Sequence, residues 1–159
     1  MKNLKLFEAI AIIISLHGGK LFSKTKLVKI LYLIEKAFFE KYHKPLFGLK
    51  FKSYFYGPYS KEIDEALEEL RNLGFIGIQN EESLLTGRNY YVIQLFAAPN
   101  FEALSNEERE FIASLTRNYV EKSLDDILEE VYSTEEYKRT PFGEEIHFGA
   151  RASFQGSSE

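Results

Sequence analysis

The first third of the chain holds two stretches in which apolar residues recur at helical spacing. In residues 5–16 they return every three or four positions, and a pair of glycines follows where a helix would end. Residues 25–42 carry two apolar stripes side by side. An apolar arc this wide predicts a helix that is buried on more than one side, and therefore a central one. His17 and His43 lie at the two predicted C-termini.

The middle of the chain changes to a period of two. Residues 49–56 alternate between two faces, which predicts a short strand. Gly57-Pro58 then predicts a turn that opens a helix, since proline suits the first helical turn. Ser60 is a candidate N-cap for that helix, which is expected to end at Leu73-Gly74.

Two further strands are predicted after this helix. They cover residues 75–79 and 90–95, and the link between them is mostly polar. A helix followed by an antiparallel hairpin is the order of elements in a winged helix. This part of the chain therefore predicts a winged-helix-like unit.

The last third is helical again and acidic. A capping box begins at Ser105, and Ser123 is a candidate cap for the following helix. A turn is expected around Thr140-Pro141, with a short final helix through Ile146. Residues 149–159 are rich in serine and glycine and are expected to form a flexible tail.

These elements add up to one domain over residues 1–148. We expect a mainly α-helical fold, a helical bundle with a small antiparallel β element and the winged-helix-like unit. The length of 159 residues fits a single domain, and 45% hydrophobic with 28% charged residues is an ordinary globular composition. The longest apolar run, residues 9–16, is too short to span a bilayer, so we expect no membrane association and a cytoplasmic protein.

The charge of the chain is divided unevenly between its two halves. Residues 1–61 hold twelve lysines against three glutamates, a net charge of +9, whereas residues 62–159 hold eight basic against twenty-one acidic residues, a net charge of −13. A basic half favours nucleic acid or an acidic partner, and an acidic half favours a basic partner. The two halves facing each other would also account for the pattern.

The residue types offer little for catalysis. Cysteine is absent, and the three histidines do not have the spacing of a zinc hydrolase site. No glycine-rich loop has the pattern that cradles phosphate, and no serine has the setting of a nucleophile elbow. The sequence therefore predicts a protein that is not an enzyme, without a metal site or a cofactor.

Residues 50–61 form the most distinctive stretch of the chain. Aromatic and basic residues alternate here, at Lys50, Lys52, Tyr54, Tyr56, Tyr59 and Lys61. Such residues stack on bases and bind phosphates, make protein interfaces, or pack against a central helix. A second candidate surface is the polar face of the helix over residues 25–42, which carries Lys26, Lys29 and Lys36.

The predicted helix after Ser60 does not have the charge of a DNA reader. Its exposed positions carry five acidic residues against Lys61 and Arg71. A helix that binds in a groove of DNA normally concentrates lysine and arginine on this face. Binding of DNA through this helix is therefore disfavoured.

The order of motifs resembles the Panacea family of antitoxin-like domains. The resemblance covers residues 25–76 and, less strongly, residues 105–146. It rests on the Lys-Leu-x-Lys-Ile-Leu-Tyr-Leu run at residues 26–33, on the turn with Pro45 and Gly48, and on Tyr56-Gly57-Pro58-Tyr59-Ser60. In the second part, Ser123-Leu124 and the Lys-x-x-Pro-x-Gly segment at residues 138–143 recur.

The resemblance implies a binding role. Such proteins act as phage-associated antitoxins that neutralise a partner toxin by contact, and some deliver the toxin to a protease. We therefore expect a protein partner, with a winged-helix-like transcriptional regulator that binds DNA as the alternative. The residues expected to bind the partner are the three lysines of the long helix together with Lys50, Lys52, Tyr54, Tyr56, Tyr59 and Lys61. Gly57, Pro58 and Ser60 are expected to shape the segment.

Overall fold

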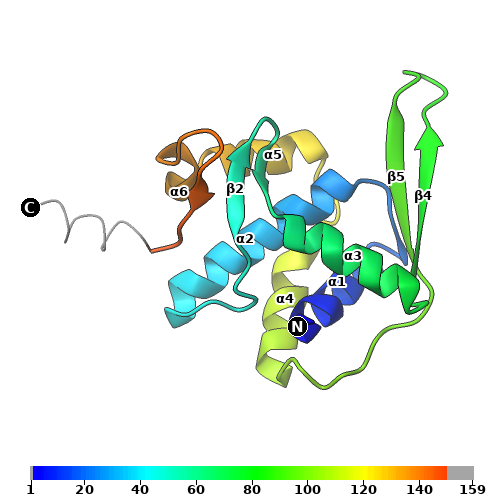
Figure 1. The fold of residues 1–159 in the computed structure, drawn as a ribbon, viewed down its shortest axis with the longest axis horizontal. Coiled ribbons are helices and arrows are strands. Elements are labelled where there is room, and N and C mark those ends of the chain that lie inside the picture. The colour runs from blue at the N-terminus through cyan, green and yellow to red at the C-terminus, as the bar shows by residue number, and fades with distance from the viewer. Residues whose placement is uncertain (1, 150–159) are drawn as a thin grey trace, which may run out of the picture.

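The protein combines six helices with two small antiparallel sheets within residues 2–149, the part of the chain that the computed structural model describes (Figure 1). The predicted tail lies outside these residues from residue 150 onward. The helices are α1 (Leu4–Leu16), α2 (Lys24–Tyr42), α3 (Lys61–Asn72), α4 (Asn106–Arg117), α5 (Leu124–Tyr132) and α6 (Glu135–Lys138). The strands are β1 (Lys20–Leu21), β2 (Phe51–Tyr54), β3 (Gly57–Tyr59), β4 (Ile76–Glu82), β5 (Asn89–Leu95) and β6 (Glu145–Ile146).

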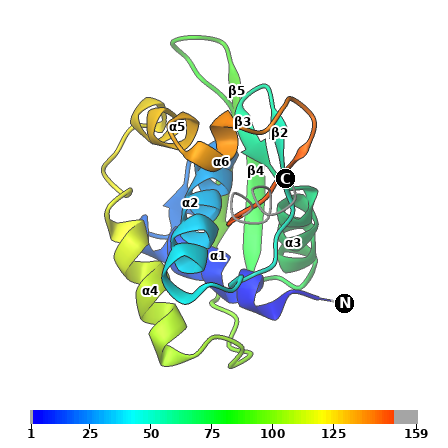
Figure 2. The ribbon, with the colours of Figure 1, turned by 90° about the vertical axis from the view of Figure 1, so that its left-hand side faces the viewer.

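The helix α2 lies at the centre of the molecule, as its two apolar stripes predict. It contacts α4, α5, β3 and β5, and its apolar residues from Leu27 to Ile34, together with Phe38, are buried. Figure 2 shows α3 and α4 on opposite sides of α1, which contacts both of them. Ser23 caps the N-terminus of α2 by accepting a hydrogen bond from the Lys26 N–H, and His43 ends the helix in a left-handed conformation.

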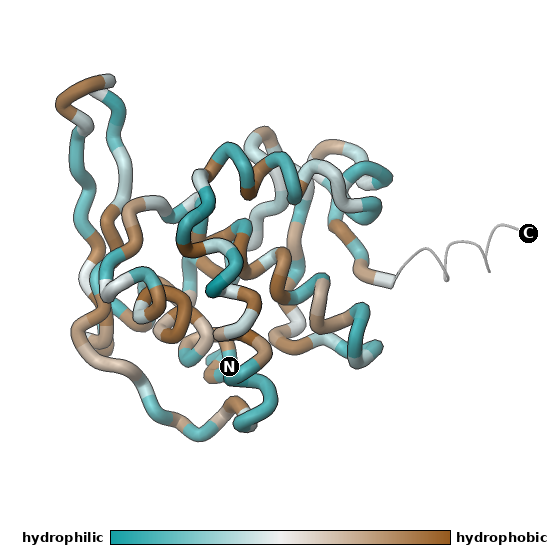
Figure 3. Tube along the Cα trace, turned by 180° about the vertical axis from the view of Figure 1, so that it is seen from behind, coloured by the Kyte–Doolittle hydropathy of each residue, from teal (hydrophilic) through white to brown (hydrophobic). Residues whose placement is uncertain are grey.

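The hairpin β4–β5 follows α3, so the predicted order of helix and hairpin is present. The strands are longer than predicted, because the polar link pairs as far as Glu82 with Asn89. β1, which the sequence did not reveal, pairs with β5 at its base and completes a sheet in the order β1-β5-β4. The far end of the hairpin stands away from the body of the molecule (Figure 1). Its tip, apolar in Figure 3, carries the fully exposed Leu84 and Leu85.

The second sheet differs from the prediction. Gly57-Pro58 was expected to form a turn that opens a helix. Instead these residues form β3, and the turn lies two residues earlier, at Phe55-Tyr56. Proline fits this position because Ser53, its neighbour on β2, makes its backbone hydrogen bonds to the segment before β6 and not to β3. The Ser53 N–H donates to the Glu144 carbonyl, and the Ser53 carbonyl accepts from the Gly143 N–H. Pro58 therefore has no ladder bond to donate.

The predicted helix through Ile146 is also wrong. α6 ends at Lys138, and after Pro141 the chain returns as β6 to pair with β2, with Ile146 opposite Phe51. This pairing gives the sheet the order β3-β2-β6. Both Phe51 and Ile146 are buried in the hydrophobic core, so this segment contributes to the core as a strand.

Two buried glutamates hold the segments that have no regular structure. The carboxylate of Glu35 accepts hydrogen bonds from four consecutive backbone N–H groups, those of residues 46–49, at 2.8 to 3.2 Å. Glu8 accepts from backbone N–H groups between residues 101 and 104 and from the Arg109 guanidinium. Burial raises the pKa of Glu35, and the four N–H donors oppose this shift. Each glutamate thereby ties a long connection to the core helices.

Candidate partner-binding site

The turn of the hairpin β2–β3 carries exposed aromatic rings. Phe55 is 82% exposed and Tyr56 75% exposed, while Phe51 and Ser53 on the other face of β2 are buried. Because β2 alternates its faces, Lys52 and Tyr54 point to the same exposed side. The alternation that predicts a strand here therefore also predicts which side chains are available to a partner.

A distant segment of the chain extends this aromatic surface. Phe142, in the loop between α6 and β6, lies with its ring centroid 4.7 Å from that of Phe55 and 5.9 Å from that of Tyr54. The Tyr54 and Tyr59 rings are 6.0 Å apart across the hairpin. We call the five rings of Tyr54, Phe55, Tyr56, Tyr59 and Phe142 the aromatic patch.

Three of the predicted lysines border the aromatic patch. Lys50, Lys52 and Lys61 are exposed and line one open groove together with Tyr54 and Tyr59. Carboxylates share the groove, at Glu62, Glu65 and Glu145, and the Glu62 carboxylate accepts a hydrogen bond from the Lys50 N–H. The structure thus brings together five of the predicted binding residues around a groove of mixed charge.

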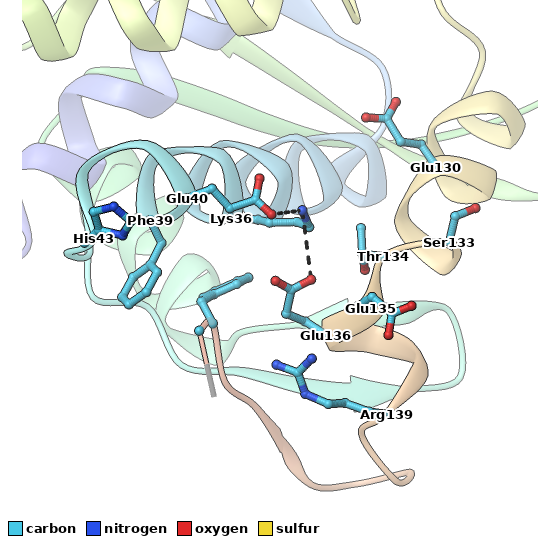
Figure 4. Close-up of a pocket in the computed structure, with 12 residues that line it drawn as sticks. Lys36, Phe39, Glu40, His43, Glu130, Ser133, Thr134, Glu135, Glu136 and Arg139 are labelled. Atoms are coloured by element: carbon cyan, nitrogen blue, oxygen red, sulfur yellow. Dashed lines mark hydrogen bonds and ion pairs between the residues drawn. The ribbon is translucent and has the colours of Figure 1, made fainter. Parts of the chain in front are cut away.

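The lysines of α2 do not form the exposed basic face that the sequence predicts. Lys26 donates to the Val120 carbonyl at 3.2 Å, and Lys36 donates to Glu40 at 2.5 Å. The same Lys36 ammonium lies 4.0 Å from Glu136 across an open cavity between α2 and α6 (Figure 4). Contacts from residues far along the chain therefore occupy this face.

Lys29 departs furthest from the prediction, because it is only 3% exposed. Its ammonium donates to the Pro58 carbonyl at 2.6 Å, and its stem lies against Gly57. The helix α2 and the strand β3 are joined by this contact. Ser60 is the N-cap residue of α3, as predicted, but its hydroxyl bonds to Glu62 rather than to a helical N–H.

We expect Lys29 to make the stability of the protein depend on pH. Burial lowers the pKa of Lys29 from 10.5 to about 8. Between these values the unfolded chain holds one more proton than the folded chain, so the free energy of unfolding rises with pH, by about 1 kcal/mol from pH 7 to pH 9. In Lys29→Met this contribution is absent. Urea unfolding of both proteins at pH 7, 8 and 9 measures the difference, and parallel pH profiles would contradict the expectation.

The comparison with Lys29→Met cancels the contribution of other groups, such as Lys26, whose pKa is also lowered by burial. Burial also raises the pKa of Tyr32 and of Tyr119, so these side chains ionise more readily in the unfolded chain. They lower the free energy of unfolding only at strongly alkaline pH. Lys61→Met, which removes an exposed lysine, is the matched control and should keep the pH profile of the unchanged protein.

Sequence reasoning missed Phe142 and left Phe55 out of the predicted binding residues. Phe142 lies in the turn with Pro141 and Gly143, where only its pairing with the β2–β3 hairpin gives it a role. Phe55 interrupts the alternation of tyrosines, and its position in a two-residue turn explains its exposure. For Phe142, its place between proline and glycine was the available signal.

Two other kinds of site find no support in the described residues. No group of three or more histidine, aspartate or glutamate side chains within residues 2–149 is placed to hold a metal ion. None of the helices in this range combines the length and the apolar character that a bilayer crossing requires.

Comparison with known proteins identifies the family. The chain matches the family described as "Antitoxin SocA-like, Panacea domain" over residues 27–138, which include most of α2, both hairpins and the helices α3 to α6. The chain therefore belongs to this family of antitoxin-like domains, as its motifs suggested.

A curated relative is similar to a shorter part of the chain. The chain is 40% identical over 59 residues to "Uncharacterized protein YwgA" of Bacillus subtilis (strain 168), a stretch that makes up 37% of this chain and 32% of that protein. The chain thus matches about a third of the length of this relative. No solved structure gives a significant match.

Proposed function

We propose that the protein is a non-enzymatic, cytoplasmic binding module that holds a toxin-like protein partner through the aromatic patch and the neighbouring Lys50, Lys52 and Lys61. The observation that carries this proposal is the patch itself, in which Phe142 from a distant segment packs against Tyr54 and Phe55, Tyr59 packs against Tyr54, and the exposed Tyr56 follows Phe55 in the turn. Exposed apolar area of this kind is typical of protein interfaces, where tyrosine and phenylalanine are enriched. Membership of an antitoxin-like family supports the same role.

The alternative is a winged-helix-like regulator that binds DNA. Its recognition element would be α3, whose acidic residues are partly neutralised: Asp64 pairs with Lys24, Glu69 with Lys2, and Glu68 with Arg71. Even so, the exposed face of α3 carries no excess of positive charge for phosphate. A protein partner is therefore favoured.

We expect the partner to be lost when the aromatic patch is made polar. The variant Phe55→Ser with Tyr56→Ser changes two exposed side chains, so the fold should be preserved. Captured from the native host, the unchanged protein should hold one stoichiometric protein, and the variant should hold less than a tenth of it. A weaker loss is expected for the triple variant Lys50→Glu, Lys52→Glu, Lys61→Glu, because charges at the edge of an interface contribute less.

The hairpin β4–β5 provides the matched control. Leu84→Ser with Leu85→Ser also removes two exposed apolar side chains and should leave the partner bound. Loss of the partner in this control but not in the patch variant would overturn the proposal. Recovery of nuclease-sensitive DNA in place of a protein would favour the regulator.

The role as an antitoxin has its own test. The captured partner, expressed alone, should arrest growth, and co-expression with the unchanged protein should restore it, either by contact alone or through degradation by a protease. The patch variant should fail to restore growth. A partner that does not affect growth would leave a binding module that is not an antitoxin.

A further inference from the structure

A cavity of about 310 Å³ lies between the N-terminal half of α2, the hairpin β2–β3 and the strand β5. Its walls include Tyr54, Tyr56, Tyr59 and Tyr91, and its two charged residues are Lys24 and Lys29. No carboxylate from residues 2–149 lines it. A cavity of this size with mostly aromatic walls and few polar groups has the character of a small-molecule site.

The two lysines of the cavity differ in their surroundings. Lys24 forms an ion pair with Asp64 at 2.5 Å. Lys29 has no carboxylate within 4 Å among residues 2–149, and one neutral acceptor, the Pro58 carbonyl, takes one of its three N–H donors. Buried charges are ordinarily paired, so a buried ammonium without a counter-ion at the wall of a cavity leaves its charge for a ligand to match.

The shape of the cavity indicates the rest of the ligand. Of the two ammonium groups in the cavity, Lys29 is the one without a carboxylate partner among residues 2–149. One such charge matches one singly charged anionic group, such as a carboxylate, better than a doubly charged phosphate. The tyrosine walls offer faces and edges against which a flat ring packs. We propose that this cavity binds an aromatic carboxylate, with its carboxylate on the Lys29 ammonium and its ring between the tyrosines. The proposal does not depend on the identity of a protein partner.

The experiment uses benzoate as the probe, with benzamide and benzylamine as a neutral and a cationic ring of similar size. Chemical shifts of the uniformly labelled protein are followed during each titration at pH 7. Benzoate should bind saturably to one site and at least tenfold more tightly than either control. Shifts of similar size and midpoint for all three compounds would overturn the proposal, as would benzoate shifts that do not saturate.

The variants locate the site. Lys29→Met should weaken benzoate at least tenfold and leave benzamide unchanged, whereas Lys61→Met, an exposed lysine outside the cavity, should leave both unchanged. Tyr91→Ala removes an exposed wall contributed by β5 and tests the site even where Lys29→Met fails to fold; it should weaken benzoate at least threefold. Unchanged benzoate affinity in Lys29→Met, or in Tyr91→Ala where that variant alone folds, would overturn the proposal.

The pH dependence of binding is an independent readout. An anion binds the protonated Lys29, so the affinity for benzoate should fall about tenfold for each pH unit well above the pKa of Lys29, near 8. The titratable groups around this ammonium are Lys24 from α2, Tyr54, Tyr56 and Tyr59 from the hairpin, Tyr91 from β5 and Tyr132 from α5. A constant affinity between pH 7 and pH 9.5 would overturn the proposal.

Discussion

Glu35→Ala should lower the free energy of unfolding by about 4 kcal/mol. The Glu35 carboxylate accepts the N–H groups of Leu46 and Phe47 on one oxygen and those of Gly48 and Leu49 on the other. Alanine leaves all four donors without this acceptor, and three of the four residues are buried. Buried donors without partners are costly because the bonds they made to water in the unfolded chain are not replaced. Urea unfolding followed by circular dichroism measures the loss.

Two further variants separate the causes of this loss. Glu35→Gln keeps the size of the side chain but replaces one carboxylate oxygen by an NH2 group. This group cannot accept from the two N–H donors that face it, so the free energy of unfolding should fall by about 2 kcal/mol. Glu40→Ala makes the same substitution at an exposed position of the same helix and should change it by less than about 0.5 kcal/mol. A Glu35→Ala protein as stable as Glu40→Ala would show that the segment over residues 46–49 does not need this anchor.

The anchor bears on the proposed function as well as on stability. Residues 46–49 lead directly into β2, whose turn carries Phe55 and Tyr56. A loosened segment would allow β2 to shift on the core, and the rings of the aromatic patch would lose their fixed arrangement. The folded part of the Glu35→Ala protein should therefore bind the partner more weakly than the unchanged protein does.

The helices α1 to α5 could be predicted because the information that defines them is local. The two apolar stripes of residues 25–42 identify α2 and its central place, and Ser105 and Ser123 cap α4 and α5 as the sequence indicates. The aromatic and basic character of residues 50–61 likewise predicted a shared surface, and five of those residues surround one groove.

What could not be predicted depends on contacts between residues far apart in the chain. Lys29 lies at a position of α2 that the sequence alone predicts to be exposed. Its ammonium is buried because β3 brings the Pro58 carbonyl, which accepts its hydrogen bond, against the helix. Phe142 joins the aromatic patch because β6 pairs with β2, a pairing of two residues that no periodicity reveals. Gly57-Pro58 has the composition of a turn, yet the hydrogen bonds of Ser53 to the opposite side allow it to form a strand.

The packing of α2 and α5 against β3 also makes Gly57 a position where a side chain is strained. We expect Gly57→Ala to lower the free energy of unfolding by about 2 kcal/mol. The residue has φ +95°, which L-amino acids rarely adopt, and an added Cβ would lie 3.2 Å from Cε1 of Tyr132 and 3.4 Å from Cε of Lys29. Backbone strain and crowding therefore act together. Urea unfolding at pH 7 measures the loss, with the far-ultraviolet spectrum confirming that the helices persist.

Gly143→Ala is the matched control for the contribution of backbone strain to this loss. Gly143 has a similar φ of +85° in the neighbouring loop, but an added Cβ there has no atom within 4 Å. This variant should therefore lose only the conformational part, about 1 kcal/mol. The contact part is tested by combining Gly57→Ala with Tyr132→Ala, which removes the crowding ring: the double variant should be more stable than the sum of the two single losses predicts. Equal losses for Gly57→Ala and Gly143→Ala, with additive behaviour of the double variant, would show that the close packing of α2, α5 and β3 around Gly57 does not contribute to stability.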